Sequence, residues 1–153
     1  MTIDQRLAEL GITLPAAAAP VASYVPYVEV GDLLHISGQI SFAEDGSLIK
    51  GRLGEDMDLE AGQAAARRCG IMLLAQLHNA LGSLDRVERI VKLGVFVSST
   101  GDFTDQPKVA NGASELMQDV FGEAGRHARS AVGGAVLPLG VAVEVDAVVQ
   151  IKP

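Results

Sequence analysis

The chain contains no tryptophan, only two tyrosines and four phenylalanines, and its formal net charge at pH 7 is -7. Lysine and arginine are scattered along it without a basic run. Proteins that hold nucleic acids usually combine a positively charged groove with aromatic side chains that stack on bases. The composition therefore argues against such a groove, and we expect no nucleic-acid partner.

Paired cysteines and long apolar runs are also missing. The single cysteine, Cys69, excludes an intramolecular disulfide and is compatible with a reducing compartment. Asp4, Arg6 and Glu9 occupy the N-terminal stretch where a signal peptide would need an apolar core, and no apolar run is long enough to span a bilayer. We therefore expect a cytoplasmic protein with no membrane partner.

Motifs for metals, nucleotides and nucleophiles are absent as well. His35, His78 and His127 have neither HxxxH nor HExxH spacing, so we predict no metal site. The glycines at 133 and 134 do not form a phosphate-binding motif, and no serine lies in a GxSxG elbow. The sequence implies no cofactor.

The pattern of the 153 residues predicts one domain, 1–153, in which residues 1–20 form an N-terminal helix and an Ala-Pro linker. The expected elements are a hairpin around Gly31-Asp32, a helix over 58–81 ended by Gly82, a strand over 89–97, a helix from Pro107, a strand from Arg129 and a strand over 141–151. This order, with hairpins at both ends, favours an α+β fold with two helices on one face of a mixed sheet.

The last predicted strand alternates strictly between apolar residues and a second set that includes Glu144, Asp146 and Val148. Side chains on a strand point alternately to its two faces, so Glu144 points away from the apolar core. Because Val148 shares the face of Glu144, that face is only partly suited to water. We therefore expect copies of the chain to associate.

Arg129 and Glu144 are the candidate chemical groups. A guanidinium can hold a carboxylate through two parallel hydrogen bonds, and a carboxylate can orient or deprotonate water. Arg129 follows a loop and enters a strand with small residues and glycines, which let a ligand approach the backbone. An ordinary exposed arginine and an ordinary surface glutamate are the simpler interpretations. Cys69, on the apolar side of the long helix, is predicted to fill the core.

Several short motifs together resemble the Rid family, also called the YjgF family, whose members include enamine/imine deaminases and proteins formerly called L-PSP endoribonucleases. These motifs are Tyr24, the SGQ at 37–39, the stretch from Val95 to Phe103, Asn111, the ARS at 128–130 and the VEVDA at 143–147. The resemblance extends from about Val21 to Ile151. It implies a chorismate-mutase-like fold and a homotrimer with ligand clefts between subunits.

The resemblance also implies a role for each matching residue. Arg129 matches the arginine that holds the substrate carboxylate, and Glu144 matches the acid that positions the hydrolytic water. The remaining matches are substrate-binding: Tyr24 closes the cleft, Ser37 and Gly38 form its floor, Asn111 lines it, and the backbone of Ala131 offers hydrogen bonds. Ala131 replaces a cysteine of many members, the loop over 100–108 is longer, and the N-terminal helix is an addition.

The implied reaction is hydrolysis of a 2-imino acid, formed from a 2-enamino acid, to a 2-keto acid and ammonia. A protonated imine is already electrophilic, so a held carboxylate and an aligned water suffice without a cofactor. The alternative is a non-catalytic trimer that binds or senses a small carboxylate through Arg129. A ribonuclease is disfavoured by the negative charge, the few aromatics and the missing pair of acid and base histidines.

Overall fold

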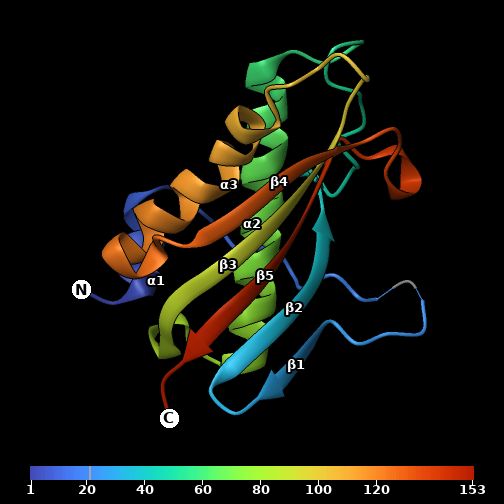
Figure 1. Ribbon diagram of the computed structural model, residues 1–153. Helices are drawn as coiled ribbons and strands as arrows, with labels where there is room; N and C mark the ends of the chain where they lie inside the picture. The colour runs from blue at the N-terminus through green and yellow to red at the C-terminus, as the bar shows by residue number, and fades with distance from the viewer. Residues whose placement is uncertain (21) are drawn as a thin grey trace.

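The computed structural model describes residues 1–20 and 22–153, so Val21, where the family resemblance begins, lies outside the described residues. The elements of this part are α1 (Ile3–Glu9), β1 (Tyr27–Val30), β2 (Leu33–Ile40), α2 (Leu59–Leu81), β3 (Val87–Ser98), α3 (Gln106–Phe121), β4 (Ala128–Gly134) and β5 (Val143–Ile151), with short 3₁₀ turns at Leu84–Arg86, Gly122–Gly125 and Pro138–Gly140 (Figure 1). The predicted α+β class with a mixed sheet is confirmed. No helix in this described part is both long and apolar enough to cross a membrane.

The long helix α2 begins and ends where its sequence predicts. The Asp58 carboxylate accepts a hydrogen bond from a backbone N–H of the first turn, and Gly82 ends the helix with a φ of 77°. The apolar stripe from Ala65 to Leu77 is buried. Within it, the Cys69 thiol donates to the Val143 carbonyl oxygen at 3.3 Å, and burial raises the pKa of this thiol. Cys69 is therefore a core residue, as predicted.

The sheet has the strand order β1-β2-β5-β3-β4, and every neighbouring pair is antiparallel except β3 and β4. The predicted hairpin of β1 and β2 is confirmed. The predicted hairpin at the other end is wrong, because β4 pairs with β3 while β5 lies between β2 and β3. α3 connects β3 to β4, and a helical crossover brings two strands side by side in parallel. β5, with its long apolar row, takes the central position under the helices.

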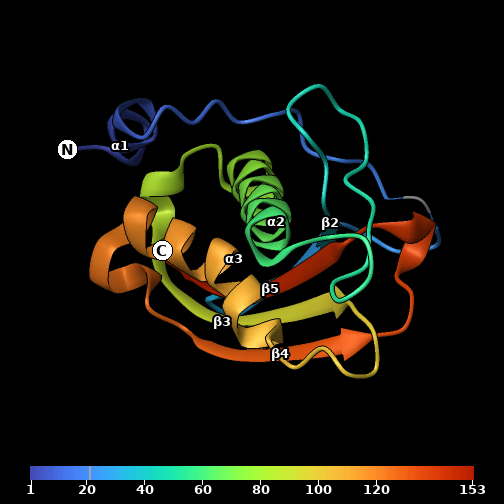
Figure 2. The ribbon, with the colours of Figure 1, turned by 90° about the horizontal axis from the view of Figure 1, so that it is seen from above.

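The two faces of the sheet differ in what covers them. α2 and α3 lie on one face, as predicted, and α1 lies on the same side (Figure 2). The opposite face, which we call the open face, has no helix of the described chain over it (Figure 2). It carries four exposed apolar side chains: Val28, Val30, Phe96 and Val132. These side chains suit contact with another molecule, and self-association stays a prediction.

Close packing of α2 and α3 depends on Gly112 in α3. A Cβ atom at this position would collide with the backbone carbonyl oxygen of Gln63 in α2. Gly112→Ala is therefore expected to lower the free energy of unfolding by about 1–2 kcal/mol, because the collision outweighs the roughly 1 kcal/mol that alanine adds to a helix. Urea denaturation measures the change. Gly101→Ala is the control, since nothing lies within 4 Å of a Cβ there, and equal effects of the two substitutions would contradict this packing.

Candidate functional site

Arg129 on β4 is held by the first half of α3. Its Nη1 donates hydrogen bonds to Asn111 Oδ1 at 2.9 Å and to Ser114 Oγ at 3.1 Å, and its Nη2 donates to the Pro107 carbonyl oxygen at 3.2 Å. Within residues 1–20 and 22–153, no acidic side chain forms a salt bridge with this guanidinium. Neutral acceptors therefore orient the cation without neutralising it. We call Arg129, Asn111, Ser114 and His127 the arginine cluster.

His127 supports the arginine cluster through Ser114. Its Nδ1 lies 2.7 Å from the Gly125 carbonyl oxygen, which can only accept a hydrogen bond, so Nδ1 carries the proton. The unprotonated Nε2 then accepts from the Ser114 hydroxyl at 2.8 Å, and Ser114 Oγ accepts from Arg129. Burial lowers the pKa of His127, and the nearby Arg129 charge lowers it further. The neutral imidazole thus fixes the direction of the Ser114 hydroxyl toward itself.

The arrangement leaves part of the guanidinium free for a ligand. A guanidinium has five N–H groups, and the three hydrogen bonds to α3 occupy both on Nη1 and one on Nη2. The Nε–H and the second Nη2–H have no hydrogen-bond partner in the part of the chain that the structure describes. These two groups can form a pair of parallel hydrogen bonds with a carboxylate, which is the strong geometry for an arginine. The arginine cluster is therefore chemically able to bind a carboxylate.

Glu144 on β5 lines a cavity of about 410 Å³, which we call the glutamate pocket. Its other walls come from Ala18–Pro20 and Tyr24, from Gly38–Ile40 of β2, and from the turn that contains Leu139. The register of β2 against β5 shifts around Gly38. A Cβ on residue 38 would lie 2.8 Å from Glu144 Cδ, so this glycine makes room for the carboxylate.

The environment of Glu144 makes its carboxylate more basic. Burial raises the pKa of Glu144, and the neighbouring Asp146 carboxylate raises it further. A carboxylate with a raised pKa accepts a proton from water more readily. No lysine or arginine lines the glutamate pocket among the described residues, so a second anion inside it would be unpaired. No group of three or more His, Cys, Asp or Glu in residues 1–20 and 22–153 is arranged to hold a metal ion.

Arg129 and Glu144 lie on opposite faces of the sheet. Arg129 pairs with Leu93 of β3, which is fully buried beneath the helices. Glu144 pairs with Phe96 of β3, which belongs to the open face. Directly paired residues share a face, and residues three apart on one strand do not. The two predicted catalytic groups therefore cannot meet around one small molecule within a single chain.

The remaining predicted residues divide between these two places. Asn111 orients Arg129, and Ala131 lies two residues further along β4, on the same face and partly buried against the core. Tyr24 and Gly38 line the glutamate pocket with Glu144.

Ser37 was predicted as part of the cleft floor, and its hydroxyl has an observed partner. It donates to the Val25 carbonyl oxygen at 2.7 Å, while the Ser37 N–H donates to the Pro26 carbonyl oxygen at 2.9 Å. Ser37 therefore fixes the segment that carries Tyr24.

Sequence reasoning missed three residues of these sites. Ser114 follows Asn111 by three positions, so helical spacing alone places it on the same side of α3. His127 entered the predictions only through its spacing, which does not suit a metal site, and nothing in the sequence links it to Ser114. Leu139 has a φ of 60°, which residues other than glycine rarely adopt and which no sequence signal indicates.

Comparison with known proteins gives a family and several similar chains. The family model described as "YjgF/chorismate_mutase-like, putative endoribonuclease" matches residues 4–150. The chain is 56% identical over 151 residues to Protein TCP17 of Trypanosoma cruzi, covering 98% of this chain and 94% of that protein. It is 28% identical to a 2-iminobutanoate/2-iminopropanoate deaminase of Dermatophagoides farinae, covering 92% and 95%. The crystal structure of Atu1372 from Agrobacterium tumefaciens, a protein of unknown function, matches with a TM-score of 0.90 and 45% identity over 99% and 94%.

The lowered pKa of His127 predicts a pH dependence of stability. In the unfolded chain this histidine binds a proton near pH 6.5, whereas in the folded chain it binds one only at lower pH. Between these two pH values, protonation of His127 favours the unfolded state. The contribution of His127 to the free energy of unfolding should fall as the pH is lowered from 7 to 5, so the natural chain should lose more stability over this range than His127→Gln does. Urea denaturation at fixed protein concentration measures both. Equal slopes in the two proteins would contradict a neutral His127.

Proposed function

The chain belongs to the YjgF/chorismate mutase-like family, and from this premise we propose that it hydrolyses reactive 2-enamino and 2-imino acids to 2-keto acids and ammonia. One observation carries the proposal, namely an oriented guanidinium that has no acidic partner among the described residues and has two N–H groups left for a carboxylate. The similarity to a protein named as a 2-iminobutanoate/2-iminopropanoate deaminase supports the choice of substrate.

In the proposed reaction, Arg129 binds the substrate carboxylate through its Nε–H and free Nη2–H. Binding the carboxylate at one end of the small molecule fixes the position of its imine carbon. The reaction with water then starts from a bound, oriented substrate and not from a random collision. Asn111 and Ser114 keep the guanidinium in place, and His127 keeps Ser114 in place. The anchor is built before the substrate arrives.

Glu144 then acts on water. Its carboxylate accepts a proton as the water oxygen bonds to the imine carbon, and the electron pair of the C=N double bond moves to nitrogen. The resulting carbinolamine carries a hydroxyl and an amino group on one carbon. Return of the proton to nitrogen makes the nitrogen a leaving group. As the C–N bond breaks and ammonia leaves, the hydroxyl gives its proton to the Glu144 carboxylate, and the C=O bond of the 2-keto acid forms. The raised pKa of Glu144 suits a group that takes and returns a proton near neutral pH.

The proposal requires two copies of the chain at each site. Because Arg129 and Glu144 lie on opposite faces of one sheet, a substrate bound to Arg129 reaches Glu144 only when a second copy supplies it. Exposed Phe96 and Val132 on the open face provide apolar surface for such contact. We propose a homotrimer with three such sites, as the family resemblance implies.

A carboxylate-binding protein without catalytic activity is the second candidate. It is favoured by the fact that the arginine cluster is complete within one chain and does not need Glu144 to bind an anion. The two candidates differ in what Glu144 does. If the protein releases 2-keto acid from 2-iminopropanoate faster than buffer alone does, it is an enzyme. If it binds the 2-keto acid without speeding this release, it is a sensor.

Substitution of the two charged groups should give different results. Arg129→Ala is expected to abolish turnover and to weaken binding of pyruvate, the keto acid product, by roughly 10- to 100-fold, because a charge-assisted pair of hydrogen bonds is lost. Glu144→Gln should reduce turnover by about 100-fold or more while changing pyruvate binding little, since a general base acts mainly in the transition state.

Assays on 2-iminopropanoate generated in situ, together with calorimetry of pyruvate binding, measure these effects. Arg126→Ala is the control, because Arg126 is exposed and its nearest acidic partner is Glu123 at 3.8 Å. Unchanged turnover in both the Arg129 and Glu144 variants would remove the proposed site.

A further inference from the structure

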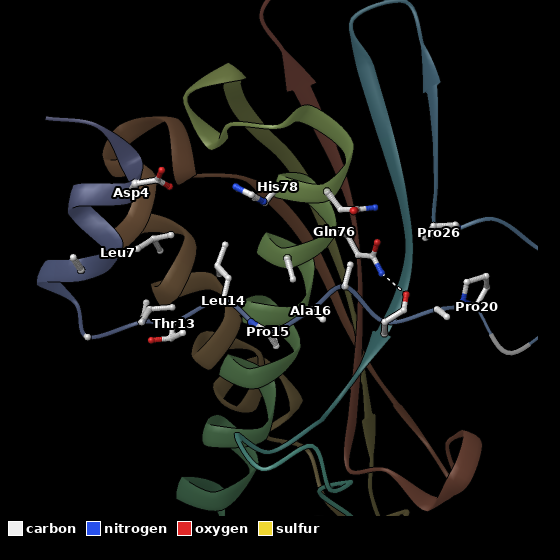
Figure 3. A pocket seen from close by; sticks show the side chains of 18 residues that line it. Asp4, Leu7, Thr13, Leu14, Pro15, Ala16, Pro20, Pro26, Gln76 and His78 are labelled. Carbon is white, nitrogen blue, oxygen red and sulfur yellow. Dashed lines mark hydrogen bonds between the residues drawn. The ribbon is translucent and has the colours of Figure 1, made fainter.

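The N-terminal segment 13–20, which we call the strap, connects α1 to the glutamate pocket. α1 is fixed at the far end by buried Leu7, by a hydrogen bond of 2.9 Å from the Ile3 N–H to Asp85 Oδ1, and by one of 2.7 Å from Arg6 Nε to the Asp119 carbonyl oxygen. The strap then runs past α2, with a cavity of about 980 Å³ between them (Figure 3). It is therefore held at separate points rather than by continuous packing.

Gln76 on α2 is the point that holds the pocket end of the strap. Its Nε2 donates to the Ala18 carbonyl oxygen at 2.8 Å, the interaction drawn as a dashed line in Figure 3. Only 1% of Gln76 is exposed, and its Oε1 has no partner among the described residues. A buried acceptor without a partner is costly and rare. The amide keeps this orientation because the reverse one would set Oε1 against the Ala18 carbonyl oxygen.

The last residues of the strap, after its contact with Gln76, form part of the wall of the glutamate pocket. Ala18, Ala19 and Pro20 line it, and none of the three adds a charge or a polar side chain. Leu139 also lines the pocket, with 60% of its surface exposed and a φ of 60°. An apolar side chain that is exposed and held in a rarely populated backbone conformation suggests a functional constraint at this position.

We infer that Ala18–Pro20, tethered by Gln76, and Leu139 form the wall that selects the substrate side chain, favouring apolar chains longer than a methyl group. This inference rests on the proposed function. The carboxylate and imine groups are assigned to Arg129 and Glu144, so only the side chain remains to occupy the apolar part of the pocket. The Glu144 carboxylate disfavours an acidic side chain there, because Arg129 of the second copy is occupied by the substrate's own carboxylate and no cation lines the pocket among the described residues.

The experiment measures how kcat/KM depends on side-chain length. The substrates are 2-imino acids generated in situ by an amino acid oxidase from alanine, 2-aminobutyrate, norvaline, norleucine and glutamate. Each added methylene should raise kcat/KM about threefold to fourfold in the natural chain if it is fully buried. The glutamate-derived imino acid should react at least about tenfold more slowly than the norvaline-derived one, because its carboxylate would be buried unpaired.

Two substitutions test the wall separately. Gln76→Met is close to Gln in size and removes both the tether and the unpaired oxygen, whereas Leu139→Gly removes the side chain and suits the φ of 60°. Both should flatten the dependence of kcat/KM on chain length, because a longer side chain then gains less buried contact than it does in the natural chain. Val136→Ala is the control, because Val136 is exposed in the same loop outside the pocket. An unchanged length dependence in both variants would overturn the inference.

Binding of the matching 2-oxo acids, measured by calorimetry, separates this inference from the proposed function. Affinity that rises with chain length without any turnover would support the wall and reject the deaminase. Turnover that does not depend on chain length would support the deaminase and reject the wall. If neither turnover nor binding is detected, both the wall and the deaminase are rejected.

Discussion

Residue pairing across β3 is the constraint on which the rest of the structure depends. The parallel pairing of Leu93 with Arg129 turns the guanidinium toward α3, where neutral acceptors hold it. The antiparallel pairing of Phe96 with Glu144 turns the carboxylate to the open face. Since a slip of one residue would move a side chain to the other face, this register alone separates the cation from the base. A chemical step that needs both must therefore use two chains.

Separation of the two charges also explains how each side chain keeps its properties. Within one chain, Glu144 does not neutralise Arg129, because the two side chains lie on opposite faces of the sheet. Burial next to Asp146 raises the pKa of Glu144, and the hydrogen bonds from α3 orient Arg129 without cancelling its charge. A substrate that brings its own carboxylate is then the natural counter-ion in the assembled site.

Local patterns predicted the fold well where the signal lies within one element. The capping residues Asp58 and Gly82 mark the two ends of α2, and the strict alternation of apolar and other residues identified β5. The neighbours of β5 could not be predicted, because they depend on α3 making a crossover and on the central sheet position favouring an apolar strand. Arg129 and Glu144 were identified from the chemistry of their side chains and their positions on predicted strands, and the family resemblance implied their roles. Their placement on different faces, and the link from His127 to Ser114, arise from contacts between elements that no local pattern contains.

Activity of mixed assemblies tests the shared site most directly. Arg129→Ala and Glu144→Gln chains, each nearly inactive alone, are co-expressed with different tags, and assemblies that contain both are isolated. These mixed trimers should regain about a third of the natural activity, because one of the three interfaces in each combines an intact Arg129 with an intact Glu144. The control is the doubly substituted chain alone, which should stay inactive. Mixed assemblies that remain as inactive as the single variants would contradict a site built between two chains.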